Sequence, residues 1–302
     1  MPVGPGETHC GFIALLGAPN AGKSTLMNSM VGAKVSIVTQ KVQTTRTRIL
    51  GVTALGTSQL VFVDTPGIFT PRRRLDRAMV AAAWSGAADA DVVALLIDAG
   101  MPIEGDTRRI IDRLNQNGGR AVCVLNKIDT VPRENLLALI EKLSVEEVFT
   151  EFFMVSALKG EGVEKLKEFF VGRLPEGPWH FPEDQLSDMN DRLFSAEVTR
   201  EKLFLNLHQE LPYALTVETE TWEPFDNGAV KVEQVIYVER ASQKGIVLGK
   251  GGERIKRVRM LAQGDLQELM GRDVHLFLFV KVRENWGDDP EHYRDWGLDF
   301  RT

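Results

Sequence analysis

Four short segments carry residue types suited to nucleotide chemistry, and they follow one another at residues 17–24, 64–67, 126–129 and 156–158. The first reads Gly-x-x-x-x-Gly-Lys-Ser. In such a loop the backbone N–H groups surround phosphate oxygens, the lysine neutralises phosphate charge and the serine hydroxyl binds Mg²⁺. Alone, the loop is compatible with ATP, with GTP or with a chance match. The remaining three segments decide between these ligands.

The second segment opens with Asp64, directly after a predicted buried strand over residues 59–63. A carboxylate at this place can hold Mg²⁺ through water, while the N–H of Gly67 can reach the γ-phosphate. Taken alone, the segment also fits an ordinary turn before Pro66. The phosphate loop earlier in the chain favours the metal site.

The third and fourth segments contain groups that can recognise a guanine base. The Asp129 carboxylate can accept hydrogen bonds from N1 and from the exocyclic N2 of guanine, a pair of donors that adenine lacks. Lys127 would lie along the base, and the backbone after Ser156 would donate an N–H to guanine O6. The order of the four segments therefore predicts a GTP site.

Nearly continuous apolar runs alternate with helical patterns from residue 11 to about residue 174. Such runs are typical of strands buried on both faces, and the intervening helices indicate an α/β domain with a mainly parallel sheet. The predicted strands are residues 12–16, 59–63, 92–97, 121–125 and 152–155, and helical spacing covers residues 136–143 and 163–170.

A proline-rich stretch without periodicity separates this half from the rest. It predicts three parts: a GTPase domain over 1–175, a linker over 176–188 and an RNA-binding domain over 189–302. The last part has the predicted order α-β-β-α-β, with a helix over 192–211, strands over 214–221 and 230–239, a helix over 255–270 and a strand over 274–282.

Gly249 and Gly252 form a Gly-x-x-Gly loop before an amphipathic helix, the pattern of a KH module. Glycines without β-carbons let the backbone approach a nucleic-acid strand, and Lys250 can reach a phosphate. Residues 181–302 carry 16 Lys and Arg against 23 Asp and Glu, yet residues 240–259 carry seven basic residues and one acid. This local excess favours binding of one short single strand. A glycine-rich turn before a solvated helix is the alternative.

Composition limits the class of protein. The chain has 302 residues, 43% hydrophobic and 26% charged, and a net charge of −6. These values predict a soluble globular protein that does not bind nucleic acid over its whole surface. Two cysteines, no apolar run long enough for a bilayer and no N-terminal signal pattern indicate a cytoplasmic setting.

The four segments and the Gly-x-x-Gly loop together resemble the Era family, over nearly the whole chain. The resemblance implies an α/β P-loop GTPase domain followed by an α+β type II KH domain. It implies hydrolysis of GTP to GDP and phosphate, and binding of the 3′ end of small-subunit ribosomal RNA during maturation of the small ribosomal subunit. GTP would order the switch loops and make the RNA groove accessible, and hydrolysis would release the RNA. It also implies that Thr45, rather than Thr44, is the switch threonine in the polar loop over 40–48.

Several residues are therefore assigned to sites. The nucleotide-binding residues are Gly17, Asn20, Ala21, Gly22, Lys23, Ser24, Thr25, Asp64, Gly67, Asn126, Lys127, Asp129, Ser156 and Ala157. The metal ligands are Ser24, Thr45 and Asp64, and the catalytic residues are Lys23, Asn20, Thr45 and Gly67. The RNA-binding residues are Gly249, Lys250, Gly251, Gly252, Arg254, Ile255, Lys256 and Arg259.

The position that often carries a water-orienting glutamine is Ile68, which cannot hydrogen-bond to water. Asn20 resembles an asparagine of related GTPases whose amide binds a K⁺ ion beside the phosphates. This resemblance implies slow hydrolysis that is faster in K⁺ than in Na⁺. The alternative is that Asn20 is a turn residue. The cofactors expected are GTP or GDP, Mg²⁺ and K⁺.

The residues alone leave further interpretations open. The nucleotide site of an RNA-binding module can be purely structural, and a basic stripe can bind anionic lipids, so a weak peripheral inner-membrane fraction is a further expectation. Residues 72–74 are either an RNA contact or a solvated face. The aromatic residues Trp286, Tyr293, Trp296 and Phe300 either stack on bases or anchor the tail. The default oligomeric state is a monomer.

Overall fold

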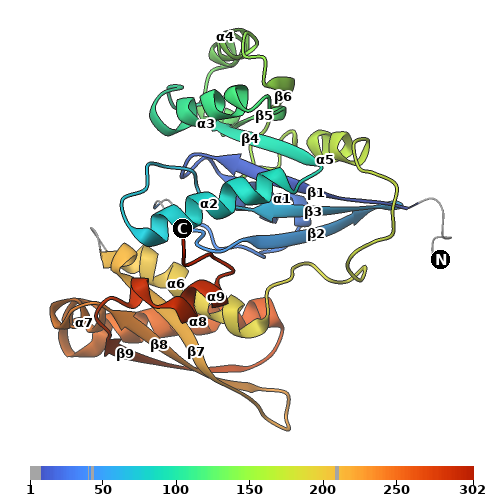
Figure 1. Ribbon diagram of the computed structural model, residues 1–302. Coiled ribbons are helices and arrows are strands. Elements are labelled where there is room, and N and C mark those ends of the chain that lie inside the picture. The colour runs from blue at the N-terminus through green and yellow to red at the C-terminus, as the bar shows by residue number, and fades with distance from the viewer. Residues whose placement is uncertain (1–7, 40, 42–43, 208–210) are drawn as a thin grey trace. The chain divides into compact units, whose positions relative to one another are not determined.

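The computed structural model describes residues 8–39, 41, 44–207 and 211–302. They form two compact units, which are described separately: one runs to Asp188 and includes Tyr293–Thr302, and the other is Met189–His292. Residues 40, 42 and 43 of the predicted switch loop lie outside the described residues. Figure 1 shows the elements of both units.

The first unit is built on a six-stranded sheet in the order β2-β3-β1-β4-β5-β6. Its strands are β1 (His9–Gly17), β2 (Ile49–Leu55), β3 (Ser58–Asp64), β4 (Val92–Asp98), β5 (Ala121–Asn126) and β6 (Phe149–Met154). Every neighbouring pair is parallel except β2 and β3, which form an antiparallel pair. The predicted mainly parallel sheet is confirmed.

Helices cover both faces of this sheet (Figure 1). They are α1 (Lys23–Val31), α2 (Arg74–Ala88), α3 (Gly105–Gln116), α4 (Arg133–Leu143) and α5 (Val163–Val171). Apolar residues of α2, α3 and α4 share one core cluster with β1, β4 and β5. On the opposite face α1 and α5 pack against β3, where the Phe62 and Phe170 rings lie 6.0 Å apart. The carboxyl ends of the parallel strands therefore meet at one edge, where loops can assemble a ligand site.

The predicted linker over 176–188 is part of the first unit and is hydrogen-bonded to it. The Gln59 side chain of β3 accepts hydrogen bonds from the backbone of His180 and Phe181. Further on, Leu50 N donates to Asp188 Oδ1 at 3.0 Å, and Val52 N donates to Leu186 O at 2.8 Å. Because these bonds satisfy the outer edge of β2, the segment protects an edge strand in addition to connecting two units.

The second unit has a three-stranded sheet in the order β7-β8-β9, with β7 and β8 antiparallel and β8 and β9 parallel. Its strands are β7 (Leu215–Pro224), β8 (Val230–Val238) and β9 (Val274–Val282), and its longer helices are α6 (Asp191–Asn206), α7 (Ala241–Leu248) and α8 (Glu253–Met270). Apolar residues of all three helices pack on one face of the sheet.

The prediction for this unit missed one helix and extended another too far. The apolar run over 246–248 is the end of α7, so the order is α-β-β-α-α-β; a helix of eight residues with Gly245 inside gives no helical period in the sequence. The helix predicted over 192–211 ends at Asn206, and Leu211–Ala214 is a short 3₁₀ turn. Residues 208–210 lie outside the described residues.

The C-terminal aromatic residues support the anchoring alternative. Trp286 is fully buried and donates from Nε1 to Ala214 O at 3.1 Å. Tyr293 and Trp296 are also buried, while the Phe300 ring lies 4.6 Å from the Arg74 guanidinium. Buried rings are not available for stacking on bases. Among the described residues, no helix is long and apolar enough to cross a membrane.

Candidate nucleotide and RNA sites

The phosphate loop turns tightly between β1 and α1. Gly22 is the N-cap of α1 with φ 96°, and a β-carbon there would lie 2.2 Å from Asn126 Nδ2. A β-carbon at Gly17 would lie 2.7 Å from Leu96 O. The neighbouring strands therefore leave no room for side chains at these glycines, and the backbone N–H groups at the start of α1 remain available to an anion.

Lys23 is held inside this loop. Its ammonium group donates to Gly17 O and Ala18 O, both at 3.1 Å, and only 6% of the residue is exposed. Burial lowers the pKa of Lys23 to about 8, while the Asp64 carboxylate acts in the opposite direction. Phosphate oxygens placed here would favour the charged form of Lys23. A bound phosphate would therefore offset the cost of burying this ammonium group.

The Asp64 carboxylate is fully buried and collects three hydroxyl groups on one oxygen. Ser24 Oγ donates to Asp64 Oδ2 at 2.6 Å, Ser36 Oγ at 3.0 Å and Thr45 Oγ1 at 3.3 Å. Burial raises the pKa of Asp64, and the hydrogen bonds and Lys23 oppose that rise. Asp64 Oδ1 has no hydrogen-bond partner within the described chain. This orphaned oxygen beside two hydroxyls is a donor set that suits Mg²⁺.

The structure distinguishes the two switch threonines. The Thr45 hydroxyl lies 3.0 Å from Ser24 Oγ, inside the cluster. The Thr44 hydroxyl instead donates to Lys41 O at 2.7 Å and lies 2.7 Å from Thr39 Oγ1. Both residues line a pocket with the phosphate loop, but only Thr45 reaches the carboxylate.

Asn126 joins the base-reading segments to the phosphate loop. Its Nδ2 donates to Ala21 O at 2.9 Å, and its Oδ1 accepts from Lys127 N at 2.8 Å and from Ala157 N at 3.0 Å. One amide at the end of β5 thus fixes three of the four segments relative to one another. The roles of the base and phosphate loops depend on this spacing.

Asp129 and Lys127 are held by charged neighbours. A hydrogen bond from Ser156 is the largest cause that lowers the pKa of Asp129, and Lys159 Nζ lies 3.6 Å from its carboxylate. Lys127 Nζ lies 2.6 Å from Asp98 Oδ2 at the end of β4. The Asp129 carboxylate therefore stays ionised, as an acceptor for base N–H groups must. Asp98 was missed by the sequence reasoning, because no motif contains it.

The residue after Gly67 faces the core. Ile68 is 6% exposed and packs in the cluster of α2, α3 and β4, so its side chain cannot orient a water at the phosphates. Asn20 is exposed and has φ 64°, which fits the turn interpretation.

The Gly-x-x-Gly loop lies between α7 and α8. Gly249, Gly251 and Gly252 have φ of 73°, 61° and 80°. A β-carbon at Gly249 would lie 2.8 Å from Arg254 Cβ, and the Arg254 guanidinium donates to Ile246 O. Glycine is favoured at all three positions because the backbone is left-handed, and at Gly249 a close neighbour adds to the requirement.

The predicted RNA residues divide by exposure. Lys250 and Lys256 are exposed, and Ile255 is partly buried against the core. Arg254 and Arg259 make contacts within the protein, the latter to Gln263 Oε1 at 3.1 Å. Among the apolar residues beside the loop, Ile246 is 49% exposed, whereas Val247 and Val258 are core residues.

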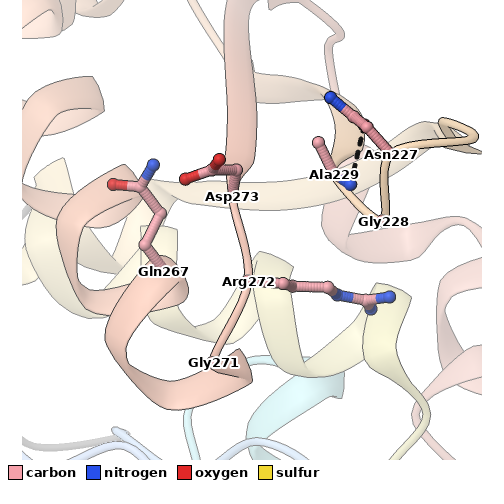
Figure 2. A pocket seen from close by; sticks show the side chains of 7 residues that line it. All are labelled: Asn227, Gly228, Ala229, Gln267, Gly271, Arg272 and Asp273. Atoms are coloured by element: carbon pink, nitrogen blue, oxygen red, sulfur yellow. Dashed lines mark hydrogen bonds between the residues drawn. The ribbon is translucent and has the colours of Figure 1, made fainter.

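Figure 2 shows a polar pocket at the opposite end of α8. It is lined by Asn227, Gly228, Ala229, Gln267, Gly271, Arg272 and Asp273. Asn227 Oδ1 accepts a hydrogen bond from Ala229 N at 3.1 Å, which closes the hairpin turn between β7 and β8. Gly271 ends α8 with φ 61°. The pocket contains no group from the Gly-x-x-Gly loop.

Comparisons with known proteins cover both halves of the chain. Residues 12–127 match the family model of the 50S ribosome-binding GTPases, and residues 210–287 match the KH domain. The GTPase Era of Rhizobium meliloti (strain 1021) is 58% identical over 97% of this chain and 94% of that protein. Two solved structures are each 36% identical and cover 96% of this chain and 99% of theirs. One is Era in complex with MgGDPNP and nucleotides 1506–1542 of 16S ribosomal RNA (TM-score 0.91), and the other is a point variant of Aquifex aeolicus Era bound to GDP·AlF₄⁻ (TM-score 0.90).

The fold and sites define a GTP-hydrolysing P-loop protein with a C-terminal KH domain. Relatives named GTPase Era are more than half identical to this chain over nearly their full length. The chain belongs to the Era family of GTPases.

The contact between Gly22 and Asn126 gives a direct prediction. Gly22→Ala should weaken binding of a fluorescent GDP by roughly a hundredfold, because the new β-carbon displaces the Asn126 amide at a cost of about 2–3 kcal/mol. Gly32→Ala is the matched control: Gly32 also has positive φ, at 78°, but no atom lies within 4 Å of an added β-carbon. Equal loss in both variants would show that only backbone strain matters.

Proposed function

We propose that this chain is a Mg²⁺-dependent GTP switch that binds the 3′ end of small-subunit ribosomal RNA and assists maturation of the small subunit. One observation carries the proposal: a guanine nucleotide site and a KH loop occur on one chain that aligns with nearly all of a solved Era bound to MgGDPNP and 16S ribosomal RNA. We further propose that the protein works in the cytoplasm as a monomer.

Residues at the carboxyl edge of the sheet would hold the nucleotide. Lys23 would neutralise the β- and γ-phosphates, and the Gly67 N–H would contact the γ-phosphate. Ser24 and Thr45 would ligate Mg²⁺, with Asp64 contacting it through water; the orphaned Asp64 Oδ1 supports this assignment. The bound Mg²⁺ would neutralise charge that develops on the phosphate oxygens.

The guanine-reading role of Asp129 is tested by a change of base preference. Asp129→Asn should reduce GTP affinity by about a hundredfold or more, since two hydrogen bonds to a charged acceptor are lost. The variant should gain affinity for xanthosine triphosphate, whose C2 carbonyl can accept from the new amide. Competition against fluorescent GDP measures both, and Asp98→Asn controls for loss of charge beside Lys127. A GTP affinity unchanged in Asp129→Asn would contradict the assignment.

Because Ile68 cannot orient the attacking water, hydrolysis needs a further group beside the phosphates. We propose that the Asn20 amide ligates a K⁺ ion beside the phosphates, in the place of a positively charged finger. Turnover should be faster in K⁺ than in Na⁺ at equal ionic strength, and Asn20→Ala should remove that difference while retaining GDP binding. Equal rates in the two salts, or a K⁺ response that survives Asn20→Ala, would exclude the ion.

In RNA binding, the exposed Lys250 and Lys256 would contact phosphates. The RNA could approach the backbone of the Gly-x-x-Gly loop closely, because its glycines have no side chains. Gly252→Asp should lower the affinity for an RNA fragment that corresponds to nucleotides 1506–1542 of 16S ribosomal RNA. The expected loss is about tenfold or more, because the new carboxylate would lie against the RNA phosphates. Gly271→Asp is the matched control, since it adds the same side chain at a left-handed glycine on the other end of α8. An equal loss in both variants would point to general charge repulsion.

A weaker proposal is a peripheral membrane fraction. Met260 and Leu261 are exposed on α8, next to Lys256 and Arg257, so one helix face is both basic and apolar. Sedimentation with anionic vesicles tests it, and the absence of binding at physiological salt would remove it.

A further inference from the structure

Three hydroxyl groups donate to one oxygen of Asp64, but they do not belong to the same part of the site. Ser24 and Thr45 line the nucleotide pocket, whereas Ser36 does not. Ser36 is 1% exposed, and its Oγ donates to Asp64 Oδ2 at 3.0 Å. Ser36 is therefore not part of the pocket wall, although it donates to the same carboxylate oxygen as Ser24 and Thr45. Its bond to the carboxylate therefore needs another explanation.

Ser36 is itself fixed by Asn28, on the helix that carries Lys23 and Ser24. Asn28 Oδ1 accepts from Val35 N at 3.0 Å and from Ser36 N at 2.9 Å, and Asn28 Nδ2 donates to Ser36 O at 2.8 Å. These three bonds attach Val35 and Ser36, at the start of the switch segment (residues 35–48), to α1. Ser36 thus keeps its place without a contribution from Thr45, nine residues further on.

We propose that Ser36 is a positioning residue that orients the Asp64 carboxylate for Mg²⁺ in both the GDP and the GTP states, and that Asn28 positions Ser36. Thr45 also reaches this oxygen, but its hold on the metal would be strengthened in the GTP state, when the γ-phosphate fixes the switch loop. Ser36, anchored to α1, donates to Oδ2 in either state and leaves Oδ1 directed to the metal. This inference depends on the Mg²⁺ site of the proposed function.

The experiment follows release of fluorescent GDP, and separately of a fluorescent non-hydrolysable GTP analogue, across a Mg²⁺ titration. Wild-type release should slow as Mg²⁺ rises. Ser36→Ala and the closer-sized Ser36→Cys should each need about tenfold more Mg²⁺ for the same slowing, since one hydrogen bond to a charged group is lost. The shift should be equal for both nucleotides. Ser36→Thr, which retains the hydroxyl, should restore the wild-type midpoint. In Thr45→Val the shift should be larger with the GTP analogue than with GDP.

Thr47→Val is the matched control. Thr47 is buried in the same segment, but its hydroxyl has no hydrogen-bond partner within the described chain. Its removal should leave the Mg²⁺ midpoint unchanged. Equal shifts in Thr47→Val and Ser36→Ala, or no shift in Ser36→Ala and Ser36→Cys, would overturn the role of Ser36 while the Mg²⁺ site stands. A wild-type release rate that does not change with Mg²⁺ concentration would contradict the Mg²⁺ site itself, and with it this inference.

Discussion

A buried carboxylate is the constraint on which the nucleotide site depends. Asp64 is fully buried at the end of a central strand, where an ionised group is costly unless other groups stabilise it. Three hydroxyls and the nearby Lys23 supply that stabilisation. To do so, α1, the start of the switch segment and the loop of Thr45 must all approach one oxygen atom. The positions of these three segments are therefore set by their hydrogen bonds to the Asp64 carboxylate.

A second constraint keeps the parts of the site in register. Asn126 has only one amide, yet it bonds to the phosphate loop, to its own segment and to the loop of Ala157. The close approach of this amide to Gly22 explains why the loop tolerates no β-carbon there. The sheet sets the approximate positions of the loops. The hydrogen bonds of Asn126 fix them more closely, as contacts to phosphate and base require.

Much of the fold could be predicted from the residues, because strands buried on both faces leave continuous apolar runs and glycine-rich loops have fixed spacing. The positions of Gly22, Lys23 and Asp64 at one sheet edge follow from the parallel sheet. Ser36 could not be found in this way, since a serine among valines and isoleucines has no motif and its role depends on a contact 28 residues away in sequence. The helix α7 was missed because it is short and contains a glycine. The segment over 176–188 has the composition of a linker, and its pairing with β2 appears only in three dimensions.

That pairing gives a continuous route along the chain from the switch loop to the second unit. Thr45 precedes β2 by four residues, Leu50 N of β2 donates to Asp188, and α6 begins at Asp191. The hydrogen-bonded route within the first unit thus ends at Asp188, three residues before α6. Under the proposed function, GTP would act on RNA affinity through this stretch of chain. The most direct test measures the affinity for the ribosomal RNA 3′-end fragment with GDP bound and with a GTP analogue bound. It also measures the affinity of each nucleotide with and without the RNA. Linkage requires one and the same factor in both directions, with RNA bound more tightly in the GTP state. RNA affinity that is identical in the two nucleotide states would contradict the account.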